Sequence, residues 1–286
     1  MGENSVVLVQ GITGNEGRFH TESMLSYGTR VVAGVTPGKG GEQVYGVPVY
    51  DKVSEAVRRH GANTSIIFVP ARAAPAAVNE AIDAGIGVVV VITESIPQRD
   101  SVEFTAKAQS RGTIIVGPNT PGVIAPAKRV KVGIMPSHVF SPGVVGIASR
   151  SGTLVYEIAW HITGAKLGQS MCVGIGGDPV VGLDFVQLLE MFRHDDGTRG
   201  VVIVGEVGGR GEEAAAEYIS ETSYPKPVVA YIAGRSAPPE KRMGHAGAIV
   251  VGNVGTAKSK VEAFVAAGVS VAEKPSDIAR LLKTKL

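Results

Sequence analysis

The chain has 286 residues, a formal net charge of +2 and one cysteine. This length suits one large domain or two modest ones, and a hydrophobic content of 44% can build a substantial core. A net charge this close to zero argues against nucleic acid or an acidic membrane surface as the main ligand. Cys172 cannot form an internal disulfide, and the apolar residues 6–9 leave no room for a signal or transit peptide, so we expect a cytoplasmic protein.

Short apolar runs rich in β-branched residues alternate with helical stretches along the whole chain. The first half predicts buried parallel strands at residues 5–10, 30–36, 65–70, 87–93 and 113–117, with helices at 74–85 and 102–112. The second half predicts strands at 143–149, 170–176, 200–207, 227–234 and 268–273, with helices at 151–162, 183–192, 212–222, 257–268 and 276–286. This alternation indicates open α/β sheets. The Pro- and Gly-rich residues 117–129 suggest a boundary, which we place between domains 1–121 and 122–286.

The first predicted strand ends in "QGITGNEGRFH", where Gly11, Gly14 and Gly17 open a helix. Such a turn brings a phosphate onto the free N–H groups of a helix N-terminus, although glycines alone are equally typical of a plain tight turn. The second strand ends in "GVTPGKGG", which offers Lys39 in place of the acidic residue that binds a ribose in dinucleotide sites. A cation there favours an additional phosphate, as in NADP or coenzyme A. The same segment lacks the spacing of a P-loop.

Three features of the second half are interpreted together. "GIASRSGTLVYE" predicts a strand, a turn and a helix that Ser151 or Thr153 caps. "VVIVGEVGGRG" places Glu206 at a strand end, and "KRMGHAGAIV" frames His245 with small residues. Individually these are more often an ordinary capped helix, a surface carboxylate and a loop histidine. Jointly they favour a phosphohistidine, in which the carboxylate orients the imidazole and helix-end amides receive the phosphate. No metal-ligand pattern accompanies them.

The sequence resembles the α subunit of succinyl-CoA synthetase, the nucleoside-diphosphate-forming succinate–CoA ligase, over essentially its whole length. The segments that carry the resemblance are "QGITGNEGRFH", "GVTPGKGG", "ITESIP", "GPNTPGV", "SRSGTLVYE", "VGIGGDP", "GEVGG" and "EKRMGHAGAI". The resemblance implies a Rossmann-like CoA-binding domain followed by a flavodoxin-like ligase domain. It also implies site residues: phosphorylated His245 with Glu206 beside it, Ser151 and Gly152 at the phosphate, Tyr156 at the acid substrate, and Thr13, Gly14, Asn15, Glu16, Lys39, Ile92, Thr93 and Glu94 at CoA.

The activity that the resemblance implies is reversible formation of succinyl-CoA from succinate, CoA and ATP or GTP. The implied route runs through a phosphohistidine and an acyl phosphate. A β subunit with an ATP-grasp fold is expected to bind the nucleotide with Mg²⁺, which accounts for the lack of a P-loop here. The expected assembly is an αβ heterodimer or a dimer of such heterodimers.

Four residues depart from what the resemblance leads us to expect. Thr120 stands where the family commonly has cysteine, Ser95 where it has glycine, and Arg210 and Pro239 also differ. Because malate–CoA ligase has a closely similar α subunit, malate remains an alternative substrate. Two readings from other classes stay open: an NADP-dependent oxidoreductase whose Lys39 binds a 2′-phosphate, and a non-catalytic CoA-binding module.

Overall fold

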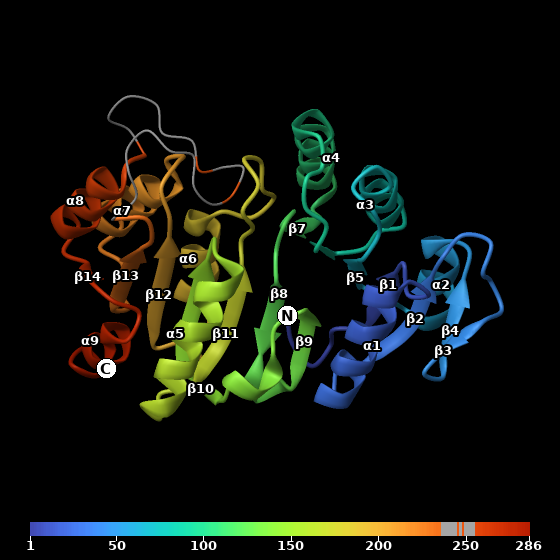
Figure 1. Ribbon diagram of the computed structural model, residues 1–286, viewed down its shortest axis with the longest axis horizontal. Helices are drawn as coiled ribbons and strands as arrows, with labels where there is room; N and C mark the ends of the chain where they lie inside the picture. The colour runs from blue at the N-terminus through green and yellow to red at the C-terminus, as the bar shows by residue number, and fades with distance from the viewer. Residues whose placement is uncertain (236–244, 246–247, 249–254) are drawn as a thin grey trace. The chain divides into compact units, whose positions relative to one another are not determined.

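The computed structural model describes residues 1–235, 245, 248 and 255–286, and these form two compact α/β units (Figure 1). The first unit comprises Met1–Ser137 with Val180–Gly182, and the second comprises His138–Pro179 with Leu183–Leu286. The predicted α/β fold class is confirmed. The boundary after residue 121 stays a prediction, and residues 122–137 group with the first unit.

The first unit is built on a sheet with the strand order β3-β4-β2-β1-β5-β6-β7. All neighbouring strands run parallel except β3, which pairs antiparallel with β4. Without β3, the order is that of the Rossmann fold, in which the chain starts in mid-sheet and builds outward in both directions. The strands are β1 (Val7–Gln10), β2 (Val31–Val35), β3 (Gln43–Val44), β4 (Val47–Tyr50), β5 (Thr64–Ile67), β6 (Val88–Val91) and β7 (Ile114–Val116).

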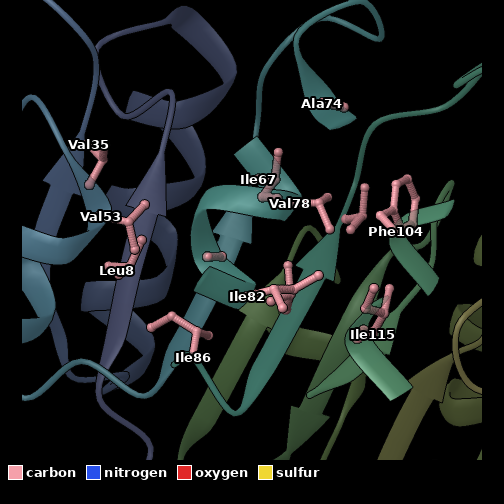
Figure 2. Close-up of a cluster of buried hydrophobic side chains, with 14 of the residues drawn as sticks. Leu8, Val35, Val53, Ile67, Ala74, Val78, Ile82, Ile86, Phe104 and Ile115 are labelled. Atoms are coloured by element: carbon pink, nitrogen blue, oxygen red, sulfur yellow. The ribbon is translucent and has the colours of Figure 1, made fainter. Parts of the chain in front are cut away.

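Helices cover both faces of this sheet. They are α1 (Asn15–Tyr27), α2 (Val53–His60), α3 (Ala74–Asp83) and α4 (Gln98–Arg111). Figure 2 shows the cluster under α2, α3 and α4, where Leu8, Val78 and Phe104 are buried together. Val7 and Val9, on the opposite face of β1, are equally buried. Burial on both faces explains why the strands are continuous apolar runs rather than alternating ones.

Two short antiparallel hairpins were not predicted from the sequence. The first joins β3 and β4 through Tyr45 and Gly46, whose φ angles of 49° and 78° are both positive. The second pairs β8 (Gly122–Ala125) with β9 (Val130–Gly133), on either side of a 3-10 turn at Pro126–Lys128. It lies largely within the Pro- and Gly-rich segment that the sequence suggested as a boundary.

The second unit contains five parallel strands in the order β14-β13-β12-β10-β11. In chain order this is 5-4-3-1-2, the arrangement of flavodoxin-like folds. The strands are β10 (Pro142–Ser149), β11 (Gln169–Gly174), β12 (Gly200–Gly205), β13 (Val228–Ile232) and β14 (Ser270–Ala272). The helices are α5 (Gly152–Gly164), α6 (Phe185–Arg193), α7 (Gly211–Glu221), α8 (Ala257–Ala266) and α9 (Asp277–Lys283), and a 3-10 turn at Ser137–Val139 precedes β10.

Every strand that the sequence predicted corresponds to an observed strand, with ends that differ by a few residues. The helix after β10 is capped by Ser151, whose side chain accepts a hydrogen bond from the amide of Leu154, whereas Thr153 is exposed. A capping box of Asp184 and Gln187 begins α6. In the part of the chain that the structure describes, no helix is long and apolar enough to cross a membrane.

Candidate functional site

The switch point of the second unit lies between β10 and β12, because the chain continues from β10 to β11 on one side and builds β12 on the other. Ligands of open α/β sheets bind at the carboxyl ends of the strands beside such a point. At these ends, β10 leads into Arg150 and α5, and β12 leads into Glu206. The topology therefore brings these residues to the place where a site is expected.

His245 meets Glu206 at this edge. Its Nδ1 lies 2.8 Å from Oε2 and 3.0 Å from Oε1 of the carboxylate. The Glu206 side chain is only 10% exposed, and that of His245 is 30% exposed. The contact between these two predicted catalytic residues, from segments far apart in the chain, fixes which ring nitrogen faces the carboxylate.

Arg150 completes the charged cluster, although the sequence analysis gave it no role. Its Nε lies 3.3 Å from Oε1 of Glu206, at ion-pair distance but without hydrogen-bond geometry. Its Nη2 donates to the main-chain oxygen of Asp178 at 3.4 Å. The "SRSG" turn could have indicated this residue, because an arginine between a strand end and a helix N-terminus is well placed to bind anions.

The backbone of Gly177 packs directly against the His245 ring. A Cβ atom at this position would lie 2.3 Å from both Cγ and Cδ2 of His245, closer than non-bonded atoms approach. Glycine is therefore required here for the ring to reach Glu206. In the sequence, the only signal was the glycine pair in "VGIGGDP", which carried no assigned role.

The surroundings raise the pKa of His245 above its ordinary value. The largest cause is the hydrogen bond to Glu206, which stabilises the imidazolium form, whereas burial and the charge of Arg150 act in the opposite direction. Asp178 adds a smaller raising effect. Glu206 thus holds the ring in one orientation and raises its pKa, whereas the charge of Arg150 limits that rise.

The N-terminus of α5 adjoins the cluster through Arg150. The Ser151 amide donates to Oγ of Ser149 at 3.1 Å, and Oγ of Ser149 donates to the Ser151 carbonyl at 2.7 Å. This serine turn shapes the start of the helix, where Gly152 is the first helical residue. The positive end of the helix dipole lies here, which favours a bound anion.

Tyr156 lies on α5 just beyond its first turn. Its ring packs edge-on against Phe140, with the ring centroids 6.4 Å apart. Burial raises the pKa of the phenol to about 12. Its predicted position at the acid substrate stays a prediction.

The glycine turn of the first unit has the predicted arrangement. Gly14 is the N-cap of α1, and Gly11 has a φ of 79°. A Cβ atom on Gly17 would lie 2.1 Å from the Gly11 carbonyl oxygen, so the helix packs directly on the strand end. Thr13 donates through Oγ1 to Oγ1 of Thr36 at 3.2 Å, which joins this turn to the end of β2. Asn15 and Glu16 begin the helix and are exposed.

The other predicted CoA residues follow β2 and β6, on either side of β1 and β5 in the same sheet. Lys39 follows β2, is about half exposed, and its Nζ lies 3.0 Å from Oε1 of Glu42. Ile92, Thr93 and Glu94 follow β6, and Thr93 donates through Oγ1 to the carbonyl oxygen of Val69 at 2.7 Å. Ser95 adopts a φ of 61°, the left-handed region that glycine enters most easily.

A pocket of ≈ 220 Å³ opens between the ends of β1, β2 and β5 and the helix α3. Sequence reasoning named only Gly11 among the residues that line it. The lining residues are Gln10, Gly11, Val35, Thr36, Pro37, Val69, Ala73, Ala76, Ala77 and Glu80. Its largely apolar wall beside the glycine turn suits a flat ring system next to phosphates.

Thr120 is buried, and its Oγ1 accepts a hydrogen bond from the Gly122 amide at 2.9 Å. Arg210 is the N-cap residue of α7. Pro239, together with the small residues that frame His245 in the sequence, lies outside the described residues. From the sequence we expect Gly244, Ala246 and Gly247 to leave the histidine unhindered, and this stays a prediction.

Comparison with known proteins identifies both halves of the chain. A family described as a CoA binding domain matches residues 3–95, and a family described as CoA-ligase matches residues 148–270. The Rossmann-like unit thus belongs to a CoA-binding family, as predicted.

The chain is 58% identical over 280 residues to the ADP-forming succinate–CoA ligase subunit alpha 2 of Archaeoglobus fulgidus, covering 98% of this chain and 96% of that protein. It is 55% identical over 284 residues to the corresponding alpha subunit of Methanothermobacter thermautotrophicus, covering 99% and 96%. Its fold is similar to that of ATP citrate lyase from Methanothrix soehngenii, solved with citrate and coenzyme A, with a TM-score of 0.89 and 24% identity. The similarity covers 99% of this chain and 50% of that one.

Identity at this level over nearly the whole length, with the CoA-binding and ligase units in the same order, shows that the chain belongs to the family of succinate–CoA ligase α subunits.

Proposed function

We propose that this chain is the CoA-binding and phosphoryl-carrying subunit of a ligase that converts succinate, CoA and a nucleoside triphosphate into succinyl-CoA, reversibly. The observation that carries the proposal is the contact of His245 Nδ1 with the buried carboxylate of Glu206, at the carboxyl edge of a flavodoxin-like sheet. The names of the relatives, which are ADP-forming succinate–CoA ligases, support succinate as the acid and ATP as the nucleotide.

The first step is phosphorylation of His245. Glu206 accepts the hydrogen of Nδ1, so the lone pair of the neutral ring is on Nε2. Nε2 attacks the γ-phosphorus of the nucleotide, a bond to phosphorus forms, and the bond to the nucleoside diphosphate breaks. Glu206 stabilises the positive charge that the ring gains, and Arg150 and the start of α5 at Ser151 and Gly152 favour the phosphoryl charge.

The second and third steps transfer the phosphoryl group and then the acyl group. A carboxylate oxygen of succinate attacks the phosphorus of the phosphohistidine, which yields succinyl phosphate and free His245. The thiol of CoA then attacks the acyl carbon, loses its proton, and expels inorganic phosphate as the thioester forms. Tyr156 contributes to binding of the acid in this scheme.

CoA is bound by the first unit. Its diphosphate lies at the turn of Thr13, Gly14, Asn15 and Glu16, and Ile92, Thr93 and Glu94 contact it from the end of β6. Lys39 pairs with the 3′-phosphate. The apolar pocket beside Gly11 is suited to the adenine ring.

The nucleotide binds to a second subunit. The sequence of this chain contains no P-loop, and the name α subunit of the relatives implies a partner. We assign to that β subunit an ATP-grasp site that holds ATP or GTP with Mg²⁺. The assembly is an αβ heterodimer or a dimer of heterodimers, in the cytoplasm.

The experiment is co-expression with a β-type subunit, followed by an assay of thioester formation from a panel of acids that includes succinate and malate. Succinate should be the preferred acid, and the isolated chain should bind CoA without forming a thioester. Thioester formation by the chain alone, or preference for malate, would contradict the corresponding part of the proposal. A chain that binds NADPH in competition with CoA would instead support an oxidoreductase.

A further inference from the structure

A buried ion pair lies behind the site, between the helices α7 and α8. Lys260 and Glu212 are both fully buried, and Nζ of Lys260 donates a hydrogen bond to Oε2 of Glu212. A second carboxylate, that of Glu213, lies 3.8 Å from the same Nζ. Burying charged groups is costly unless they are well paired, so this arrangement calls for an explanation beyond packing.

The other oxygen of Glu212 contacts the loop between β12 and α7, which contains Glu206. Its Oε1 accepts a hydrogen bond at 3.0 Å from the backbone amide of Glu206, the residue whose side chain meets His245. Lys260 contacts the same loop, because its Nζ donates to the carbonyl oxygen of Gly208 at 2.7 Å. The pair therefore holds the main chain on both sides of Val207.

The loop between β12 and α7 needs such anchors. It contains Gly208 and Gly209, whose φ angles of 93° and 64° are positive, and glycine has more conformational freedom than any other residue. The Glu212 side chain packs directly on Gly205, because a Cβ atom there would lie 2.5 Å from Cγ of Glu212. Glycine at the strand end therefore leaves the space that the Glu212 carboxylate occupies.

The network also reaches the beginning of α8. The Gly208 amide donates to the carbonyl oxygen of Gly255 at 2.7 Å. Ser259, one residue before Lys260, donates through Oγ to Oε1 of Glu213 at 2.9 Å. The start of α8, the start of α7 and the Glu206 loop are therefore joined by buried and partly buried polar contacts, and networks of this kind favour one defined arrangement.

We propose that Glu212 and Lys260 are positioning residues for phosphoryl transfer: Lys260 fixes the Glu212 carboxylate, which holds the backbone of Glu206 so that its side chain reaches Nδ1 of His245. Neither residue touches the reacting atoms. The role in phosphoryl transfer rests on the proposed function, whereas the positioning of Glu206 and His245 does not.

The test compares two double variants of the full chain that differ only at position 212, in whether the side chain can accept a hydrogen bond from the Glu206 amide. Both carry Lys260→Met, which removes the cation of the pair, and the carboxylate is removed by Glu212→Gln in one and by Glu212→Met in the other. Replacing both members of a buried pair is often tolerated, and the nearby Glu213 carboxylate, which Ser259 contacts, loses Lys260 equally in both variants. Gln still offers an amide oxygen to the Glu206 N–H, whereas Met offers no comparable acceptor.

Two readouts are needed, and the first requires neither nucleotide nor partner. The pKa of His245, followed by NMR, should fall slightly with Gln, because Lys260 no longer fixes residue 212. It should fall further with Met, because the Glu206 amide then has no acceptor and the Glu206 carboxylate no longer holds Nδ1. The rate of His245 phosphorylation in the αβ complex should fall on the order of 10–100-fold with Met and by a smaller factor with Gln. Lys131→Met, which removes a buried lysine of the first unit, is the control and should change neither quantity.

Equal values of the His245 pKa for the two double variants would overturn the proposal, whether both match the wild type or both depart from it. If the His245 pKa differs between the two double variants but the wild-type complex shows no phosphorylation, the proposed function is contradicted and the positioning role stands. If the double variants do not fold, amide exchange in the wild-type chain decides. The Glu206 amide should then exchange as slowly as the amides of β12, and rapid exchange would contradict the proposal.

Discussion

Nδ1 of His245 lies 2.8 Å from Oε2 of Glu206, a residue 39 positions earlier in the chain. This contact leaves Nε2 as the nitrogen that can accept a phosphoryl group, because a carboxylate on one ring nitrogen fixes the tautomer. The same contact raises the pKa of the ring, with Glu206 as the largest cause. Geometry and protonation of the proposed nucleophile therefore depend on one side chain.

Glu206→Gln should lower the pKa of His245 and slow its phosphorylation at neutral pH on the order of 10²-fold, since the ring loses the carboxylate that orients it and stabilises its charge. The acid limb of the pH–rate profile should move to lower pH, because the ring then becomes neutral at lower pH. NMR titration and single-turnover phosphorylation measure these two effects. An unchanged pKa would show that the carboxylate does not act on the ring in solution.

For the same substitution we predict a loss of fold stability that depends on pH. Because folding raises the pKa of His245, the imidazolium–carboxylate pair stabilises the fold below the unfolded histidine pKa of about 6.5, and this contribution disappears as the pH rises through the higher folded value. The wild type should therefore be more stable than Glu206→Gln below about pH 6.5, with the difference shrinking at alkaline pH. Thermal unfolding across this range tests it, and a difference that grows with pH would contradict the assignment.

Arg150→Met should act on the histidine in the opposite direction. The guanidinium lies 3.3 Å from Glu206 and its charge lowers the pKa of His245, so its removal should raise that pKa and move the acid limb to higher pH. The phosphorylated state should also form less completely, since a positive charge near the phosphoryl group is lost. NMR titration compares the pKa of His245 in Arg150→Met and in Glu206→Gln. Changes of that pKa in the same direction would refute the opposing effects of the two side chains.

Gly177→Ala should displace the His245 ring, because the new Cβ atom would lie 2.3 Å from Cγ of the imidazole. We expect phosphorylation to fall at least about tenfold, as misplacement of a reacting group by about 1 Å commonly costs more than that. Gly164→Ala is the matched control, since a Cβ atom there meets no atom within 4 Å. Equal activity of the two variants in the phosphorylation assay would mean that the ring does not lie against Gly177.

Lys39→Ala should weaken binding of CoA more than binding of dephospho-CoA. Because the side chain is about half exposed and already pairs with Glu42, we expect a loss of about 1.5 kcal/mol, the lower end for a hydrogen bond to a charged group. Lys107→Ala, which removes an ion-paired lysine of the same unit, should affect neither ligand. Isothermal titration of the wild type and both variants gives the affinities for the two ligands, and equal losses of CoA and dephospho-CoA affinity in Lys39→Ala would show that Lys39 does not contact the 3′-phosphate.

The major strands were predictable because burial on both faces produces continuous apolar runs, as in residues 87–93 around β6. The β3–β4 hairpin was not, because its turn uses Tyr45 where asparagine or aspartate usually signals positive φ. The second hairpin was hidden in residues 117–129, whose Pro and Gly content resembles that of a linker.

In the candidate site, the contact of His245 with Glu206 could be predicted because each residue has unusual local chemistry for its position, whereas their catalytic roles stay predictions. Arg150, Gly177 and Glu212 were not predictable, because their roles come from contacts across the sheet. The need for glycine at position 177 appears only once the imidazole is seen against it. A glutamate on a helix is ordinary in sequence, and only tertiary contacts show that Glu212 receives the amide of Glu206.

The central claim is that His245 carries the phosphoryl group, and the direct measurement is intact-mass and peptide analysis of the αβ complex after incubation with Mg²⁺ and nucleoside triphosphate. The account predicts one phosphate on His245 that is labile in acid, stable in base, and discharged by succinate with CoA. His245→Asn should fold, bind CoA, and show neither the phosphate nor turnover, because the covalent route has no other nucleophile. An acid-stable phosphate on Ser151, or near-normal turnover by His245→Asn, would contradict the account.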